Sequence, residues 1–204
     1  MDDAHRVGVL LSGRGSNFLA LHEAMGRGEV PARVAVVVSN VAEAPGLEKA
    51  RSRGIPAFAE PRAAHSSVAA QEEAMASRLR EHGAEWVCLA GYMRILGPDF
   101  VRAFRGRILN IHPSLLPSFP GLHAQRQALA HGVKISGCTV HFVDESLDGG
   151  PIVVQRAVPV YDRDSEHDLA ERILTEEHRA YPEALRRLLV EGWRIEGRRV
   201  VFGS

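Results

Sequence analysis

Continuous apolar runs of strand length recur through the first half of the chain, separated by segments with helical spacing. The runs cover residues 7–11, 34–38 and 86–90. An unbroken apolar run is typical of a strand that is covered on both faces, as in a parallel sheet. Helices are predicted between these runs at about residues 16–27, 45–53 and 67–82. This alternation predicts an α/β fold with a central, mostly parallel twisted sheet and a Rossmann-like N-terminal half.

The pattern changes after the fourth apolar run, which covers residues 107–112. This run stops at Pro113, which cannot donate a hydrogen bond to a neighbouring strand and so marks the end of the strand. Residues 134–143 and 152–160 then have the composition of two strands joined by a turn at 147–151. The C-terminal portion of the sheet is therefore predicted to be antiparallel.

The end of the chain combines a helix signal with a hairpin signal. Ser165, with Asp168 three residues later, predicts a capping box that opens a long helix. Pro182 should kink or interrupt this helix, because proline removes a backbone donor. Residues 194–202, around Glu196-Gly197, predict a short closing hairpin. We find no repeat, low-complexity segment or linker, so a single domain over 1–204 is predicted.

Composition narrows the class of protein. At 204 residues the chain is long enough to bury a core without disulfides, and its charges balance, with 25 basic and 25 acidic side chains. No basic surface for nucleic acid and no apolar stretch for a membrane is expected, so the partners should be small molecules. Cys88 and Cys138 lie among apolar residues, as reduced thiols do. Together with an N-terminus unlike a signal peptide, this predicts a cytoplasmic protein.

Residues 12–17 form a glycine-rich turn between the first strand and the first helix. Glycines let the backbone approach a ligand, and free amides at a helix start attract an anion, although such turns also occur without ligands. A dinucleotide site would need glycine in place of Phe18 and an acidic residue in place of Ser39 or Asn40. The Gly-Lys-Ser/Thr of a P-loop is absent. A terminal monophosphate is therefore the ligand that this turn favours.

Asn110 and His112 alternate with Leu109 and Ile111 near the end of the fourth run. Alternate residues of a strand share a face, so the amide and the imidazole should point toward one place. Each could merely cap a neighbouring loop. However, the carboxyl end of a central strand, at the same edge as the glycine turn, is where open α/β sheets bind ligands. The pair is therefore a candidate catalytic site.

Asp148 lies in the turn after the next strand, where aspartate commonly serves only as a turn former. Paired with His112, its carboxylate would orient the ring and favour a protonated, proton-shuttling imidazole. Asn110 would donate a hydrogen bond to a developing oxyanion. The three residue types suit attack of a nitrogen nucleophile on a carbonyl carbon. His123 and His141 border this region and are more commonly structural, so we do not count them as catalytic.

Beyond these chemical arguments, several segments resemble the glycinamide ribonucleotide formyltransferase (phosphoribosylglycinamide formyltransferase) family of the folate-dependent formyltransferase superfamily. The similar segments are 11–17, 90–96, 109–117, 140–144 and 147–151. The match runs in order from about residue 7 to 190. The Asn-x-His-Pro-Ser-Leu-Leu-Pro strand end indicates the superfamily, and the glycine turn followed by Ser16-Asn17 indicates this branch. The resemblance also implies that the Leu116-Pro117 peptide is cis.

The resemblance implies a reaction and a set of site residues. The reaction is transfer of a formyl group from 10-formyltetrahydrofolate, a cosubstrate, to the amine of glycinamide ribonucleotide in de novo purine biosynthesis, without a metal. Catalysis would fall to Asn110, His112 and Asp148. Substrate binding is implied for Gly15, Ser16, Asn17 and Glu177. Cofactor binding is implied for Met93, Arg94, Ile95, Leu96, Asn110 and Asp144.

The same resemblance divides the single domain into a phosphate-binding half, about 1–105, and a catalytic and folate-binding half, about 106–204. The protein is expected to be a monomer or a homodimer. Two positions depart from the family pattern. Val68 follows Ser67 where relatives often place an arginine near the folate tail, leaving Arg62 and Arg94 as alternatives, and Gln125 stands where some relatives have histidine.

Three other functions compete with this one. A formyltetrahydrofolate hydrolase (deformylase) uses a similar trio but usually has an extra N-terminal domain, whereas here the first strand is expected at Val7. A methionyl-tRNA formyltransferase would need a further domain and a basic surface. A non-catalytic nucleotide-binding module would have no use for Asn110 and His112 on one face.

Overall fold

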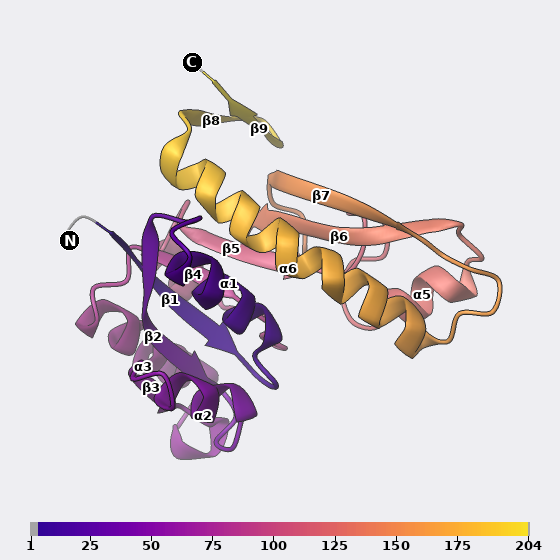
Figure 1. The fold of residues 1–204 in the computed structure, drawn as a ribbon. Coiled ribbons are helices and arrows are strands. Elements are labelled where there is room, and N and C mark those ends of the chain that lie inside the picture. The colour runs from indigo at the N-terminus through magenta and orange to yellow at the C-terminus, as the bar shows by residue number, and fades with distance from the viewer. Residues whose placement is uncertain (1–3, 204) are drawn as a thin grey trace. The chain divides into compact units, whose positions relative to one another are not determined.

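The computed structural model describes residues 4–203 and confirms the predicted α/β fold. The chain divides into two compact units, with the boundary between Leu109 and Asn110. Figure 1 shows the ribbon of each unit. Whether they act as the single domain predicted from the sequence stays a prediction.

The first unit is built on parallel strands in the order β3-β2-β1-β4. The strands are β1 His5–Leu11, β2 Ala32–Ser39, β3 Ala57–Ala59 and β4 Trp86–Leu89. The helices are α1 Ser16–Gly26, α2 Pro45–Arg51, α3 Val68–Glu81 and α4 Pro98–Ala103, with a 3-10 turn, η1, at Arg62–Ala64. β1 lies between two partners, and its last five residues are buried, which explains its unbroken apolar run.

The second unit carries strands in the order β5-β6-β7-β9-β8. They are β5 Ile108–His112, which begins in the first unit, β6 Ile135–Phe142, β7 Ile152–Pro159, β8 Trp193–Glu196 and β9 Arg199–Phe202. The helices are α5 Ala124–Ala130 and α6 Glu166–Val190. The predicted antiparallel portion is confirmed, because β6 pairs antiparallel with β7. α6 runs across both of these strands (Figure 1).

The long helix α6 starts as predicted and continues where an interruption was predicted. Ser165 and Asp168 form the reciprocal capping box, which confirms the expected start. Pro182, however, lies inside an uninterrupted 25-residue helix. Proline removes one helical hydrogen bond, but Tyr181, Pro182 and Leu185 are all buried. Burial of the apolar face against β6 and β7 therefore outweighs the lost bond, and the predicted interruption is wrong.

The closing hairpin is confirmed and is anchored to the rest of the second unit. β8 pairs antiparallel with β9 through a turn at Gly197, whose φ of 61° suits glycine. Ile152 of β7 pairs with Arg199 of β9. The indole of Trp193 donates to the Leu188 carbonyl at 2.9 Å, and its ring lies 5.2 Å from that of Phe142. The hairpin is thus held by both α6 and the sheet.

Both cysteines are buried and free of disulfides, as predicted. Burial raises the pKa of the Cys138 thiol to about 12, which keeps this side chain protonated at neutral pH. Among the helices of residues 4–203, none has the length and apolar character needed to cross a membrane.

Candidate active site

The structure brings the polar side chains of β5 onto one cluster in the second unit. Asn110 is half-buried and His112 is 5% exposed, whereas Leu109 and Ile111 are buried with the core. Nδ1 of His112 lies 3.4 Å from Oδ2 of Asp148. Nδ2 of Asn110 lies 3.2 Å from Nε2 of His141. Both side chains therefore reach one group of residues, and the predicted meeting of His112 with Asp148 is confirmed.

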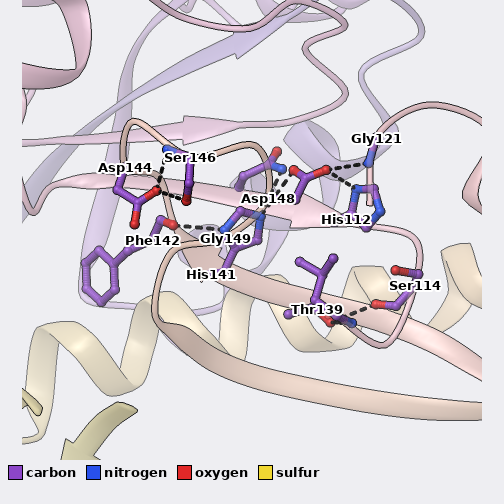
Figure 2. A network of polar contacts seen from close by, with 12 residues as sticks. His112, Ser114, Gly121, Thr139, His141, Phe142, Asp144, Ser146, Asp148 and Gly149 are labelled. Atoms are coloured by element: carbon purple, nitrogen blue, oxygen red, sulfur yellow. Dashed lines mark hydrogen bonds and ion pairs between the residues drawn. The ribbon is translucent and has the colours of Figure 1, made fainter. Parts of the chain in front are cut away.

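The Asp148 carboxylate is held in place by the backbone. Its φ of 48° is in the left-handed region, which aspartate tolerates in turns. The amide of Gly121 donates to Oδ2 at 2.8 Å. Figure 2 shows this carboxylate between Gly121 and His112. The side chain is only 12% exposed, so its charge is little screened by water where it meets the imidazole.

His112 faces an acceptor at each ring nitrogen. Nε2 lies 2.8 Å from the carbonyl oxygen of Phe119, which can only accept a hydrogen bond, so Nε2 carries a proton. Nδ1 faces the Asp148 carboxylate, which is also an acceptor. A ring with protons on both nitrogens would donate to both partners. This is the form in which an imidazole gives a proton to a departing group.

The loop that supplies the Phe119 carbonyl is fixed by its own hydrogen bonds. The hydroxyl of Ser114 donates to the carbonyl oxygens of Ser118 and Phe119, at 2.5 and 3.2 Å. The amide of Leu116 donates to the Thr139 hydroxyl at 3.0 Å, tying the loop to β6. The Leu116-Pro117 peptide is cis, as predicted.

His141 belongs to the cluster, although we did not count it as catalytic from sequence. Nδ1 donates to the Phe142 carbonyl at 2.8 Å (Figure 2). Nε2 of the neutral ring is therefore an acceptor and receives the Asn110 amide. Nε2 also lies 3.7 Å from Oδ1 of Asp148. Burial is the main cause of the lowered pKa of His141, which favours this neutral form.

His141 therefore fixes which way the Asn110 amide points. With one N–H of Asn110 given to His141, the second N–H remains for another acceptor. The sequence signal for His141 was the same as for Asn110 and His112, namely a polar residue near the end of an otherwise apolar strand.

In the first unit, the glycine turn has the geometry of an anion site. Gly15 occupies the N-cap of α1 with φ 71°, and Ser16 and Asn17 open the helix. Gly15 makes no side-chain cap hydrogen bond at this helix start, and a helix N-terminus attracts an anion. The turn rests on α2, because Lys49 donates to the Arg14 carbonyl at 2.7 Å.

Ser12 joins three loops of the first unit. Its hydroxyl donates to Oδ1 of Asn40 at 2.6 Å and accepts from the amide of Met93 at 2.9 Å. Its own amide donates to the Gly91 carbonyl at 3.0 Å. The glycine turn is thereby connected to the segment predicted to bind the cofactor. Met93 is 66% exposed and Ile95 is 75% exposed. Neither side chain therefore packs in the core, where apolar residues are more commonly found.

Residues 5–185 match the family model described as formyl transferase. The chain belongs to the formyl transferase family.

Two relatives support this membership. The *Escherichia coli* K12 phosphoribosylglycinamide formyltransferase is 45% identical over 190 residues, which are 93% of this chain and 87% of that protein. The *Drosophila pseudoobscura* trifunctional purine biosynthetic protein adenosine-3 is 48% identical over 182 residues, 88% of this chain. The chain spans only 13% of that relative's length.

Similar solved structures also support membership of this family. Glycinamide ribonucleotide transformylase 1 from *Symbiobacterium toebii* is 53% identical with a TM-score of 0.96, over 99% of this chain and 95% of that one. A formyltetrahydrofolate deformylase from *Pseudomonas syringae* has a TM-score of 0.90 at 29% identity, over 100% of this chain and 67% of that one.

The other site residues predicted from the sequence have defined surroundings. Glu177 is buried on α6, 7% exposed. Asp144 accepts from the amide of Ser146 at 2.8 Å and from its hydroxyl, which shapes the turn that leads to Asp148. Leu96, unlike its neighbour Ile95, is buried.

The segment that lacks the arginine common in relatives also has defined contacts. Ser67 caps α3 by accepting from the amide of Ala70 at 3.0 Å. Arg62 donates to the His65 carbonyl at 2.6 Å. His123 occupies the N-cap position of α5 with φ 59°. In the part of the chain from 4 to 203, no group of three or more His, Cys, Asp or Glu residues is arranged to hold a metal ion.

Replacing Gly15 with valine should weaken binding of the expected ribonucleotide substrate. A Cβ there would lie 2.9 Å from the Cα of Gly46, and the positive φ strains any side chain. We expect the KM for the phosphorylated substrate to rise at least about tenfold, since charge-assisted hydrogen bonds contribute roughly 1.5–3 kcal/mol. Gly13→Ala is the matched control, because its Cβ would meet nothing within 4 Å. An unchanged KM in folded Gly15→Val would contradict the assignment.

Burial of His141 should make the free energy of unfolding of this protein fall at acid pH. The unfolded chain binds a proton near the ordinary pKa of 6.5, whereas the buried ring resists it. Below pH 6.5 the unfolded state therefore holds more protons, and the free energy of unfolding decreases until the pH reaches the lowered folded pKa. Each unit of lowering contributes about 1.4 kcal/mol.

Urea unfolding at pH 7 and pH 5.5 measures this effect. His141→Gln keeps an acceptor for Asn110 but does not titrate, so its loss of stability between the two pH values should be smaller than in the wild type. The exposed His167 provides the control variant His167→Gln. An equal pH dependence in all three proteins would show that His141 is not responsible.

Proposed function

We propose that this formyl transferase transfers the formyl group of 10-formyltetrahydrofolate to the amine of glycinamide ribonucleotide in de novo purine biosynthesis. The observation that carries the proposal is the cluster of Asn110, His112, Asp148 and His141, which presents one free amide N–H beside a paired imidazole. The *E. coli* and *S. toebii* relatives support the choice of substrate, because their names state it.

The cluster suits direct transfer through a tetrahedral intermediate. The substrate amine attacks the formyl carbon, a C–N bond forms, and the carbonyl oxygen becomes an oxyanion. The second N–H of Asn110, left over after the bond to His141, would donate to that oxygen. The bond between the formyl carbon and the folate nitrogen then breaks. The proton lost by the amine reaches the departing nitrogen through His112, which Asp148 keeps oriented.

Each unit would supply binding residues. Gly15, Ser16 and Asn17 would bind the substrate phosphate with the amides at the start of α1. Glu177 would accept hydrogen bonds from the ribose hydroxyls. Met93, Arg94, Ile95 and Leu96 would bind the folate together with Asn110 and Asp144. In this proposal the two units act as one formyltransferase domain.

The remaining partners follow from the same proposal. Both ligands are small molecules, and the balanced charge of 25 basic and 25 acidic side chains gives no general attraction for nucleic acid. The reaction needs no metal, since the oxyanion is stabilised by an amide and the proton is carried by an imidazole. We place the enzyme in the cytoplasm, as a monomer or a homodimer.

Hydrolysis of the same cosubstrate is the second candidate. The 29% identical *P. syringae* deformylase has a closely similar fold, and water could replace the amine as nucleophile in the same cluster. The higher identities of the relatives named as glycinamide ribonucleotide enzymes favour transfer.

A mass-resolved assay separates these functions. The protein is incubated with 10-formyltetrahydrofolate, with and without glycinamide ribonucleotide. We expect formylated ribonucleotide to appear only with both substrates, and in large excess over free formate. Formate release independent of the ribonucleotide would indicate a deformylase, and binding without either product would indicate a non-catalytic module.

A further inference from the structure

The loop of residues 144–150, which presents Asp148, is fixed on one side by contacts already described. Asp144 and Ser146 bond within the loop, and the Gly121 amide donates to the Asp148 carboxylate. Gly150 lies against β6, since a Cβ at this position would come within 1.9 Å of the Phe142 carbonyl oxygen. These contacts fix the two ends of the loop and the carboxylate, and they leave the backbone at Gly149 to another partner.

That partner comes from the closing hairpin. Nη2 of Arg198 donates to the carbonyl oxygen of Gly149 at 2.8 Å. Gly149 directly follows Asp148, and a carbonyl bonded to a guanidinium is a charge-assisted contact. The hairpin lies beyond residues 5–185, which the family model matches. It is nevertheless anchored, because the Trp193 indole donates to the Leu188 carbonyl of α6 and the backbone of Arg199 pairs with that of Ile152.

A cavity adjoins the same loop. Its volume is about 220 Å³, and its lining residues are Leu116, Pro117, Asp148, Gly150, Ile152 and Arg198. Packed side chains do not fill this space, so close packing does not prevent the loop from shifting there. The guanidinium of Arg198 spans from the hairpin to the loop at the edge of the cavity.

We propose that Arg198 is a positioning residue that holds the 144–150 loop so that the Asp148 carboxylate stays on His112. We call this contact a clasp, because the hairpin holds the 144–150 loop, the catalytic loop, through the Arg198 side chain. The effect on turnover rests on the proposed formyl transfer, whereas the effect on loop order does not. Without the clasp, the left-handed turn at Asp148 would sample other conformations, and His112 would lose its carboxylate for part of the time.

The test compares Arg198→Ala with Arg199→Ala, which removes the same charge from the neighbouring exposed position of the hairpin. We expect kcat to fall roughly tenfold in Arg198→Ala, because one charge-assisted hydrogen bond supplies an effect of this size. The KM for the ribonucleotide should change little. Hydrogen exchange at the amides of 145–150 should become faster in the same variant. Arg199→Ala should match the wild type in both measurements.

Two further measurements keep the proposal falsifiable. Arg198→Lys can still donate to the Gly149 carbonyl and should recover most of the turnover and the slow exchange. Trp193 fluorescence reports whether the hairpin stays attached in each variant. The proposal is overturned if Arg198→Ala exchanges like Arg199→Ala, or if Arg198→Lys is as impaired as Arg198→Ala. A wild type without transfer activity would refute the proposed function, and the exchange data would still decide on the clasp.

Discussion

Alanine in place of His112 should lower kcat for formyl transfer by roughly a hundredfold or more, the range expected when a positioned acid or base is lost. In the structure this ring is 5% exposed, and each of its nitrogens faces an acceptor, the Phe119 carbonyl or the Asp148 carboxylate. Alanine removes both contacts, including the imidazole nitrogen that lies 3.4 Å from this carboxylate. Steady-state assays with both substrates measure the loss.

The control for this variant is His167→Ala, since His167 is exposed on α6. Circular dichroism and urea unfolding should show that His112→Ala remains folded under assay conditions. If folded His112→Ala turned over at near the wild-type rate, the ring would be a neighbour of the chemistry and not part of it.

Asn110→Ala should cost about 3 kcal/mol of transition-state stabilisation, the value typical of a lost oxyanion donor. This corresponds to a kcat more than a hundredfold lower. The amide of Asn110 is held by His141 at 3.2 Å, so it is oriented before the substrate arrives. Because the oxyanion exists only along the reaction path, KM for either substrate should change much less than kcat. A large KM effect with unchanged kcat would assign Asn110 to ground-state binding.

The two variants should not be additive. Asn110 and His112 serve the same tetrahedral carbon in the proposed mechanism, so once one is lost the other has less to stabilise. The double variant should therefore retain more activity than the product of the two single losses predicts. Fully additive losses would show that the residues act independently.

The sequence predicted those parts of the fold where a long pattern governs the structure. The buried strands β1, β2 and β4 appear as continuous apolar runs, and the start of α6 appears as a capping box. The elements that were missed are short. β3 has three residues and α4 six, too few for a periodic pattern to stand out from a loop. α5 has seven residues, like the predicted α2, but it does not lie between two apolar runs of the parallel sheet.

Pro182 shows a different limit of sequence patterns. The rule for proline describes an isolated helix, whereas α6 gains the burial of Tyr181 and Leu185 on the sheet. Local preference and tertiary packing compete, and only the second depends on residues distant in the chain.

The candidate site likewise contains residues that could be predicted from the sequence and residues that could not. Asn110 and His112 could be predicted because they share one strand, and Asp148 because a carboxylate suited the pair. His141 and Arg198 could not, because their roles depend on contacts across 31 and 49 positions of the chain. His141 has the same strand-end pattern as Asn110 and His112, but a lone histidine there is more commonly structural. Arg198 carries no local pattern that distinguishes it from a solvated residue.

The burial of both cysteines has a practical consequence for labelling. Cys88 and Cys138 are the only thiols in the sequence, each is fully buried, and the pKa of Cys138 is about 12. A maleimide dye reacts with an exposed thiolate, so the unmodified protein offers it no ready target. Leu147, 56% exposed and next to Asp148, could therefore carry a single fluorophore as Leu147→Cys. No native cysteine would need to be replaced before the 144–150 loop is labelled, because neither native thiol is exposed to the dye.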